Sequence, residues 1–555
     1  MKKLTAILLA VVMVFALGAS AFAATNSLET DYAIGDGLGV SVDLDIEGMY
    51  FDGVDILNTA TNGYYPFSFS LIASDRSKVA SVTVSNGGSF HWAYAQNADG
   101  SYVTDEDGNY VESTTTNYGV VVLPTTSAST VTVTGTGNIG SATFSCAQPN
   151  GGTTAAGTAL YAYLPAPAQF VNEGVTTGGW GDAYDSNGTV KATSSTGVSL
   201  GFFGGYAVYE FENPIADDPT HPYGADFIVY GNAFWNNSEA GCIQVSKDGQ
   251  TWYDIAGSMY YTKSTPNSTI TYNNPSVTED AAITAPGSNL GTLAPVSYTL
   301  NGAAGTVTTN TFHNHSWFPL NANYFVTYGP RAAMAKVDEL PFISRMLASN
   351  GVTDKLTFTG TLLTNYPGTN KTAEIGFGYC DVHPNKTLGG TIAYNPYQTF
   401  TSSSDYDTKV AGTSGGDPID IAWAVKSNGT PANLDSIRYV RIYTGMAQMN
   451  GIFGEISTEV CGVAACTGST TETAATPTIS VDGSTVTTTN GGILPLSKKS
   501  GDYTVNVTGT GYVYINGVAT TSATITPTRT GTKVQIIVQN GEAAPYVTYL
   551  NLQKK

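Results

Sequence analysis

The residues of this chain that could act on a ligand are mainly carboxylates, and several glutamates stand beside predicted turns or strand ends. Hydrolysis of a glycosidic bond needs two carboxyl groups at a defined separation, and the sequence selects no pair. The five histidines and five cysteines form no catalytic pairing of recognisable spacing. No serine is predicted at a nucleophile elbow between a strand and a helix. The pattern therefore favours binding over catalysis. The glutamates considered are Glu173, Glu239, Glu374, Glu455 and Glu459.

Rings and amides gather in one stretch, Ala233 to Ala240, which is predicted to be a loop. Exposed aromatic side chains stack on the apolar faces of sugars and anchor many protein interfaces. Two further tryptophans, Trp180 and Trp317, fall in predicted loops and join the candidate ligand-binding set. Core packing is an equally good interpretation for Trp235. The members of that set within the stretch are Phe234, Trp235, Asn236, Asn237 and Glu239.

Oxygen ligands at the two ends of the predicted central domain suggest a structural calcium ion (Ca2+). Asn172 and Glu173 lie near its first strand, and Glu455 lies near its last. Calcium takes about six to eight oxygen ligands, including backbone carbonyls, so these three side chains form a partial site. Surface carboxylates and hydrogen-bonded turn residues are the alternative interpretation.

Two other groups of residues could hold ligands. Asp381–Asn385 and Asp417–Asp420 flank predicted strands, and strand ends are where loops gather and ligands bind. Turn formation is the commoner role of Asp and Asn at such positions. His313 and His315 would share one face of a strand and could ligate a metal, although a polar loop is the preferred interpretation.

The loop with the rings is predicted to join two strands. Phe227–Tyr230 is a continuous apolar run, which is typical of a strand buried on both faces. Cys242–Ser246 alternates between apolar and polar side chains, and Lys247–Gln250 contains the Asp-Gly pair of a tight hairpin turn. The chain would then return along Trp252–Ile255. These elements place the loop at one end of a sandwich.

Strand patterns and Gly-rich linkers predict an all-β fold built from several β-sandwiches. A large central β domain would be flanked by smaller β domains, the last of them immunoglobulin-like. One helical passage, Arg331–Gly351, interrupts the strand pattern. The predicted divisions are a signal peptide at 1–23, an N-terminal β domain at 24–155, the central domain at 159–462, a linker at 467–476 and a C-terminal domain at 477–555.

Charge and targeting signals set the compartment and exclude some partners. Lys2 and Lys3 precede an apolar core and an Ala-Phe-Ala cleavage site, which predicts a secreted or cell-surface protein without a transmembrane segment after cleavage. The formal net charge of −20 disfavours nucleic acid and anionic lipid as partners. Cys461 and Cys466 could bond only if a turn brings them together, because an extended segment would hold them too far apart.

Four blocks of the chain resemble, in order, a family of bacterial secreted cell-surface proteins. The most specific are the strand that ends in Tyr-Gly-Asn-x-Phe and the hairpin Val-Ser-x-Asp-Gly-x-x-Trp-Tyr, within 226–258. The other blocks are 164–173, 199–208 and 434–460. The resemblance spans roughly 300 residues and implies a jelly-roll-like domain, but it carries no defined activity or catalytic residue. Its hairpin is also loosely shared with sugar-binding discoidin-like jelly rolls, which is an analogy of fold alone.

The leading hypothesis is therefore a non-catalytic binding or adhesion protein that recognises an extracellular glycan or a surface protein through end loops of the central sandwich. One alternative is a polysaccharide hydrolase or lyase whose carboxylates are unassigned. Others are a binding protein for a small nutrient such as a corrinoid, and a structural component of a surface layer. The abundance of Thr and Gly favours the last of these.

Overall fold

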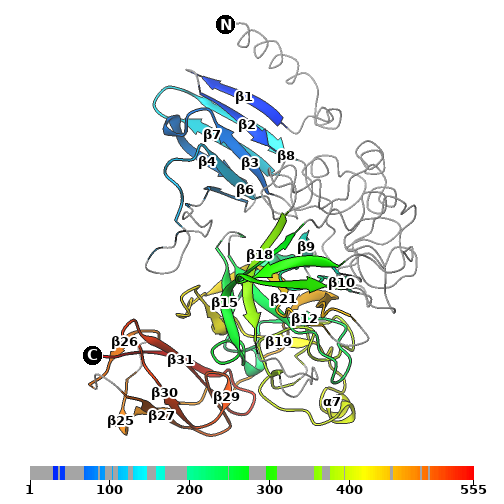
Figure 1. Cartoon of the computed structure of the whole chain (residues 1–555), viewed down its shortest axis with the longest axis vertical. Coiled ribbons are helices and arrows are strands. Elements are labelled where there is room, and N and C mark those ends of the chain that lie inside the picture. The colour runs from blue at the N-terminus through cyan, green and yellow to red at the C-terminus, as the bar shows by residue number, and fades with distance from the viewer. Residues whose placement is uncertain are drawn as a thin grey trace.

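A computed structural model gives the fold of the chain (Figure 1). The structure describes residues 29–35, 38–43, 68–85, 88–93, 95, 103, 105, 111–122, 129–146, 158–164, 166–168, 197–247, 249, 251–273, 295–308, 355–364, 375–392, 394–449, 454–487, 490–497 and 501–555.

The N-terminal strands form two antiparallel sheets whose buried residues share a core. Leu71 and Val121 from one sheet and Val131 and Val133 from the other are fully buried. Asp75 caps the short 3-10 helix Arg76–Lys78 by accepting the backbone N–H of Ser77. The five-stranded sheet has the order β1 (Glu29–Gly35), β2 (Leu38–Asp43), β3 (Ser68–Ala73), β6 (Tyr118–Val122), β5 (Ser89–Trp92). The three-stranded sheet has the order β4 (Val79–Val84), β7 (Ser129–Gly135), β8 (Ser141–Cys146).

Two facing sheets form the centre of the molecule. Phe211 on the larger sheet and Phe227 on the smaller one meet edge to face, with ring centroids 6.4 Å apart. The six-stranded sheet has the order β20 (Ala424–Val425), β14 (Tyr253–Ile255), β13 (Gly241–Ser246), β21 (Ser436–Thr444), β11 (Tyr206–Ala216), β9 (Thr158–Leu164). The three-stranded sheet has the order β19 (Asp417–Ile419), β12 (Phe227–Tyr230), β23 (Gly462–Ala465).

The apolar run Phe227–Tyr230 is the middle strand of the smaller sheet, and all four of its residues are buried. This confirms the prediction of a strand covered on both faces, because neighbours on each side satisfy its backbone while the two faces pack. The segment 231–240 then carries the chain across to β13 in the larger sheet. The predicted loop therefore crosses between the two sheets.

Smaller sheets and short helices complete the central part. A four-stranded sheet has the order β17 (Ala303–Val307), β16 (Val296–Leu300), β15 (Ser264–Asn273), β18 (Lys355–Leu363). A two-stranded sheet pairs β10 (Val198–Ser199) with β22 (Glu459–Val460). The helical elements are η5 (Pro222–Gly224), α7 (Ser403–Lys409) and η7 (Ile421–Trp423). Ser402 caps α7 by accepting the backbone N–H of Asp405.

The C-terminal strands form a second sandwich with its own core. Val505 from one sheet and Val534, Ile536 and Val538 from the other are fully buried in it. One sheet has the order β25 (Ser484–Thr485), β24 (Thr478–Val481), β27 (Tyr503–Thr508), β30 (Ser522–Ile525). The other has the order β26 (Ile493–Pro495), β32 (Tyr546–Gln553), β31 (Thr532–Gln539), β28 (Tyr512–Ile515), β29 (Val518–Ala519).

The C-terminal sandwich packs directly on the central sheets, at the lower left of Figure 1. The side-chain amide of Gln535 donates to the backbone carbonyl of Ala256 at 3.1 Å, and the Tyr514 hydroxyl donates to the carbonyl of Tyr397 at 2.9 Å. Tyr549 is buried against Val425 in the same contact. We call this contact between the two sandwiches the seam.

The predicted all-β class is confirmed, since the described residues form many antiparallel sheets and a single short α-helix. The predicted helical passage Arg331–Gly351 lies outside the described residues. Among the described helices, none is long and apolar enough to cross a membrane. Four described cysteines are free and buried, and Cys461 and Cys466 flank the extended strand β23 as the unbonded alternative requires.

Candidate functional site

Asp381 holds the loop 231–240 in place. One oxygen of its carboxyl group accepts the backbone N–H of Asn232 at 2.9 Å, and its backbone carbonyl accepts the N–H of Glu239 at 3.1 Å. The Ser238 hydroxyl donates to the carbonyl of Val382 at 2.9 Å. Both ends of the loop are therefore fixed to one short segment of the chain. Asp381 itself has a φ of 56°, in the left-handed region that Asp tolerates better than most residues.

The middle of the loop is a turn that points Phe234 into solvent. Asn237 donates its backbone N–H to the carbonyl of Phe234 at 2.9 Å, and Asn236 takes a φ of 60°. Phe234 is 62% exposed. Trp235 is half-buried and packs on Phe400 and Tyr406, with ring centroids 6.4 and 6.2 Å away. The two aromatic residues predicted to bind a ligand therefore differ in exposure, because Phe234 faces solvent whereas Trp235 is half-buried.

Glu239 turns inward from the same loop and meets two other carboxylates. One oxygen from each of Glu239, Asp381 and Glu459 lies within 4.8 Å of the other two, and we call these residues the glutamate cluster. Asp381 is fully buried and Glu459 is 4% exposed. Among the described residues, no Lys, Arg or His forms an ion pair with Glu239 or Asp381. Three ionised carboxylates at this separation would repel one another strongly.

Protons relieve that repulsion in the absence of a cation. Burial raises the pKa of Glu239 well above its ordinary value, and the charges of Glu459 and Asp381 raise it further. Burial also raises the pKa of Glu459 to about 7, although hydrogen bonds from Ser199, Glu239 and Ser457 partly oppose the shift. The hydrogen bond between the two carboxyl groups raises the pKa of Glu239 and lowers that of Glu459, which is the direction expected when Glu239 is the donor. The Ser199 hydroxyl donates to the other side of this pair, 2.9 Å from Glu459 Oε1.

The predicted calcium ligands only partly reach this cluster. Glu455 is fully buried, and its charge raises the pKa values of both Glu239 and Glu459. Asn172 and Glu173 lie outside the described residues, as do Trp180 and Trp317. Glu239 was predicted for ligand contact and Glu455 for calcium, and the fold brings these two separate predictions to one place.

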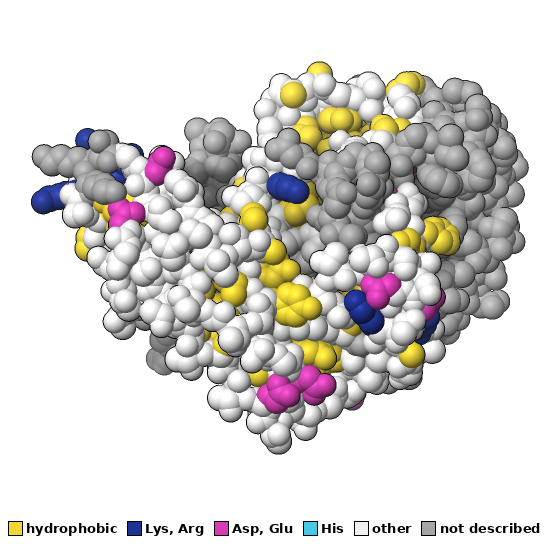
Figure 2. Space-filling view, turned by 90° about the horizontal axis from the view of Figure 1, so that it is seen from below, with side chains coloured by type: hydrophobic (Ala, Val, Ile, Leu, Met, Phe, Trp, Pro, Cys, Tyr) yellow, Lys and Arg dark blue, Asp and Glu magenta, His cyan; other side chains and the backbone are white. Residues whose placement is uncertain are grey.

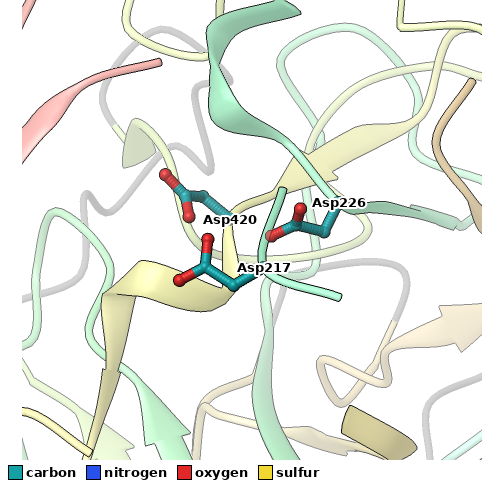
Figure 3. A group of neighbouring side chains, drawn as sticks. All are labelled: Asp217, Asp226 and Asp420. Atoms are coloured by element: carbon teal, nitrogen blue, oxygen red, sulfur yellow. The ribbon is translucent and has the colours of Figure 1, made fainter. Parts of the chain in front are cut away.

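A second acidic group lies close to the seam. Asp217 follows β11, Asp226 precedes β12 and Asp420 follows β19, and Figure 3 shows their carboxyl groups turned toward a common centre. We call these residues the aspartate cluster. Burial raises the pKa of Asp217 to about 7, with the charges of Asp226 and Asp218 adding to the effect. Burial also raises the pKa of Asp420 well above its ordinary value.

The aspartate cluster, like Asp381 in the glutamate cluster, also holds the backbone in place. Asp226 accepts the backbone N–H groups of Asp218 and Ile421, both at 2.9 Å, and His221 Nδ1 lies 3.4 Å from its carboxylate. Asp420 accepts the N–H of Ala422 and thereby caps η7. These contacts account for Asp226 and Asp420 as turn and cap residues. Three carboxylates could still share a cation there, as in the glutamate cluster.

An imidazole–carboxylate pair connects the loop to the seam. His383 Nδ1 lies 2.8 Å from Asp417 Oδ1, and the ring of His383 stacks on Tyr406 at 5.7 Å. Because an ionised carboxylate only accepts hydrogen bonds, Nδ1 donates this hydrogen bond, and in the neutral ring Nε2 is then the accepting nitrogen. The described residues offer Nε2 no hydrogen-bond partner. The predicted grouping of Asp381–Asn385 with Asp417–Asp420 thus contains this contact, but Asp381 and Asp420 belong to different clusters.

Two serines occur in the letters Gly-x-Ser-x-Gly, at Ser199 and Ser414, and the structure buries both. Ser199 is fully buried and lies 2.7 Å from the Ser457 hydroxyl. Ser414 is 2% exposed, donates to the carbonyl of Thr391 and accepts from Tyr230. Neither hydroxyl contacts an imidazole in the described part of the chain, and neither occupies a strand-to-helix elbow.

Sequence reasoning missed the partners of Glu239. Glu459 was one of several glutamates with no assigned role, and Asp381 was considered only as a strand-end residue. The one available signal was that three polar residues, Ser457, Thr458 and Glu459, lie between the apolar Ile456 and Val460, and the structure buries all five. No protein-family model matches this chain, and no curated protein matches it at a significant level.

Proposed function

We propose that this protein is a secreted, non-catalytic binding protein whose central sandwich recognises an extracellular glycan or surface protein through the loop 231–240. The observation that carries the proposal is the 62% exposure of Phe234 on a loop whose two ends are anchored to Asp381 and Val382. Displaying a large ring costs hydrophobic stabilisation unless a ligand covers it. Fixing the backbone beforehand lowers the entropy cost of binding.

The two residues that follow Phe234 in the loop support this role. Trp235 rests on Phe400 and Tyr406, which restricts the backbone that presents Phe234. Asn236 is exposed at the turn and offers both a donor and an acceptor beside the ring. Figure 2 shows hydrophobic side chains gathered toward the middle of one face, with charged side chains sparsely scattered over it. A ring with neighbouring amides suits a hydroxyl-rich ligand such as a glycan.

Substitution of Phe234 by Ala tests the proposal. Binding of the wild-type protein to a glycan array and to bacterial cell surfaces identifies a ligand, and Phe234→Ala weakens that binding by about tenfold or more, as for other central aromatic anchors. Ile493→Ala is the matched control, because Ile493 is 60% exposed but belongs to the C-terminal sandwich. Equal binding by wild type and Phe234→Ala would remove the loop from consideration.

Calcium remains part of the proposal, with its position changed. The glutamate cluster supplies three carboxylates, and Glu455 lies near enough to affect the pKa values of two of them. A bound Ca2+ would replace the shared proton of Glu239 and Glu459 and would stiffen the loop from below. This role is structural, since the cluster lies on the inner side of the loop that displays Phe234.

A second candidate function is hydrolysis or lysis of a polysaccharide. The observation that favours it is the hydrogen-bonded pair of Glu239 and Glu459, in which one carboxyl group is protonated and the other titrates at about 7. Carboxyl groups whose pKa values are pushed apart by their surroundings supply the acid and the base of several hydrolases. Incubation with a polysaccharide panel decides between the two functions. Turnover that Glu239→Gln abolishes would establish the enzyme and overturn the non-catalytic proposal.

A further inference from the structure

A pocket opens at the seam, bounded by both sandwiches. Its volume is about 270 Å3, slightly below the roughly 300 Å3 at which the usual range of ligand pockets begins. The central part contributes the turn that contains Ser258 and Lys263, the segment 396–400 and His383. The C-terminal sandwich contributes Tyr514 and the hairpin that contains Val518. The pocket therefore exists only while the two sandwiches are joined.

The wall from the C-terminal sandwich is fixed closely against the central part. Asn516 and Gly517 form the turn between β28 and β29, with φ values of 50° and 72°. Two consecutive positive φ angles are typical of the tightest hairpin turn. A Cβ atom on Gly517 would stand 1.8 Å from the carbonyl oxygen of Ser258, so the turn touches the central backbone. Tyr514 is held at the same seam by its hydrogen bond to Tyr397.

The lining combines rings with polar groups and carries little charge. Tyr514 is partly exposed and supplies aromatic surface, Tyr397 and Phe400 pack behind the lining at 1% exposure each, and the exposed Thr399 supplies a hydroxyl group. His383 reaches the same lining, with Nδ1 committed to Asp417 and Nε2 left to accept a hydrogen bond. Rings beside a few polar groups are the usual way in which proteins recognise a sugar ring, whose faces are apolar and whose edge carries hydroxyls.

The sign of the charge narrows the ligand further. Lys263 is the one side chain of fixed charge in the lining, and no Asp or Glu lines the pocket, although acidic residues outnumber basic ones by 43 to 23 in the chain. Among the described residues, no carboxylate forms an ion pair with Lys263. An ammonium group without a partner in a sparsely charged pocket favours a ligand that brings its own anion.

We propose that this pocket binds one hexose-sized sugar unit that carries a carboxylate, a uronic acid. Lys263 pairs with the carboxylate, His383 Nε2 accepts a hydrogen bond from a hydroxyl group, and the ring of Tyr514 covers part of an apolar face of the sugar. The volume limits the ligand to a single ring. This pocket is separate from the loop that carries the function proposed above. Sugar binding in the pocket does not require Phe234, and it would not support the proposed role of the loop. The two sites share Phe400, which lines the pocket and also packs on Trp235.

Titration of the full chain with galacturonic and glucuronic acid, followed by calorimetry or saturation-transfer NMR, tests the proposal. We expect saturable binding of at least one uronic acid and at least about tenfold weaker binding of galactose and glucose, the usual effect of losing one charge-assisted hydrogen bond. Lys263→Gln removes this preference. Val518→Trp fills the pocket from a residue that is 49% exposed, and it abolishes binding of both acids.

Tyr512→Trp is the matched control for the filling variant, because Tyr512 lies on the same hairpin, is 39% exposed and does not line the pocket. Absence of saturable binding to the wild type, or unchanged uronic acid binding in Val518→Trp, would overturn the proposal. Equal affinity for acidic and neutral sugars would overturn the assignment of Lys263. If Val518→Trp unfolds the seam, the exchange Lys263→Gln still decides the outcome. Phe234→Ala leaves uronic acid binding unchanged, so failure of either proposal is separable from failure of the other.

Discussion

Asp381 Oδ2 accepts the backbone N–H of Glu459 at 3.0 Å, although the carboxyl groups of these two residues stand in the same cluster. The hydrogen bond favours the ionised form of Asp381, whereas its burial and the charge of Glu459 raise its pKa. The carboxyl group of Asp381 therefore serves as the acceptor for the backbone of β22. It does so in close contact with the carboxyl groups of Glu239 and Glu459. Protons or a cation must balance the charge.

The first prediction concerns pH. Glu459 has a folded-state pKa of about 7 and a model-compound value of 4.5, and the pKa of Glu239 is raised well above its ordinary value. At pH values between 4.5 and about 7, Glu459 binds more protons in the folded protein than in the unfolded chain. The free energy of unfolding therefore falls as pH rises through this range. The stabilisation is fully present below about pH 4.5 and is lost as pH rises through 7.

Glu239→Gln should reduce this slope, because Gln keeps a hydrogen-bond donor toward Glu459 without the ability to ionise. Chemical denaturation gives the free energy of unfolding at pH 5 and at pH 8. For the wild type the two values should differ by on the order of 3 kcal/mol, as expected for a pKa shift of this size in a buried group. Glu212→Gln serves as the control, because Glu212 is exposed. If the free energy of unfolding of Glu239→Gln fell with pH as steeply as that of the wild type, Glu239 and Glu459 would not share a proton.

The second prediction concerns calcium. Millimolar Ca2+ should raise the thermal unfolding midpoint at pH 8, and EDTA should lower it, because the ion binds the folded protein only. The effect should shrink at pH 5, where protons compete for the same oxygens. Glu459→Gln removes one ligand of the glutamate cluster and should abolish the shift. Loss of the shift in Asp420→Asn instead would place the ion in the aspartate cluster.

The third prediction concerns the seam. Gly517→Ala should destabilise the protein, because the new methyl group would overlap the carbonyl of Ser258. Gly483→Ala is a matched control, since Gly483 has a similar φ of 79° in the hairpin turn between β24 and β25 but no atom within 4 Å of its added Cβ. The difference between the two variants should be about 1–3 kcal/mol, as for other overpacked sites. Equal thermal unfolding midpoints of Gly517→Ala and Gly483→Ala would show that the seam accommodates the methyl group without loss of stability.

The fourth prediction concerns the thiols. Burial raises the pKa values of Cys242 and Cys461 above their ordinary range, and it raises those of Cys380 and Cys466 as well. Because the thiolate is the reactive form, these four should resist a thiol reagent in the native protein and react after denaturation. Counting labelled thiols by mass spectrometry should find at most one per native chain. Rapid native labelling of two or more would contradict the buried arrangement.

Local pattern determined most of the strands. The apolar run Phe227–Tyr230 became β12, and the prediction of Cys242–Ser246 differs from β13 by one residue. Alternation placed Ile243 and Val245 in the core, whereas Ser246, predicted on the other face, is also buried because its hydroxyl accepts the N–H of Gly249. The strand Trp252–Ile255 was correct apart from its first residue. Such features follow from a period of two residues, which a short segment already displays.

The sequence by itself therefore established an all-β chain with a loop of rings and amides between two strands, because burial periodicity and turn chemistry act over a few residues. Only the tertiary structure decided which carboxylates meet. Glu239, Asp381 and Glu459 come from three distant segments, and the order of strands β12, β13 and β22 in space brings them together. It also decided that Phe234 is displayed while Trp235 is half-covered, since covering a ring depends on distant residues such as Phe400 that no local pattern encodes.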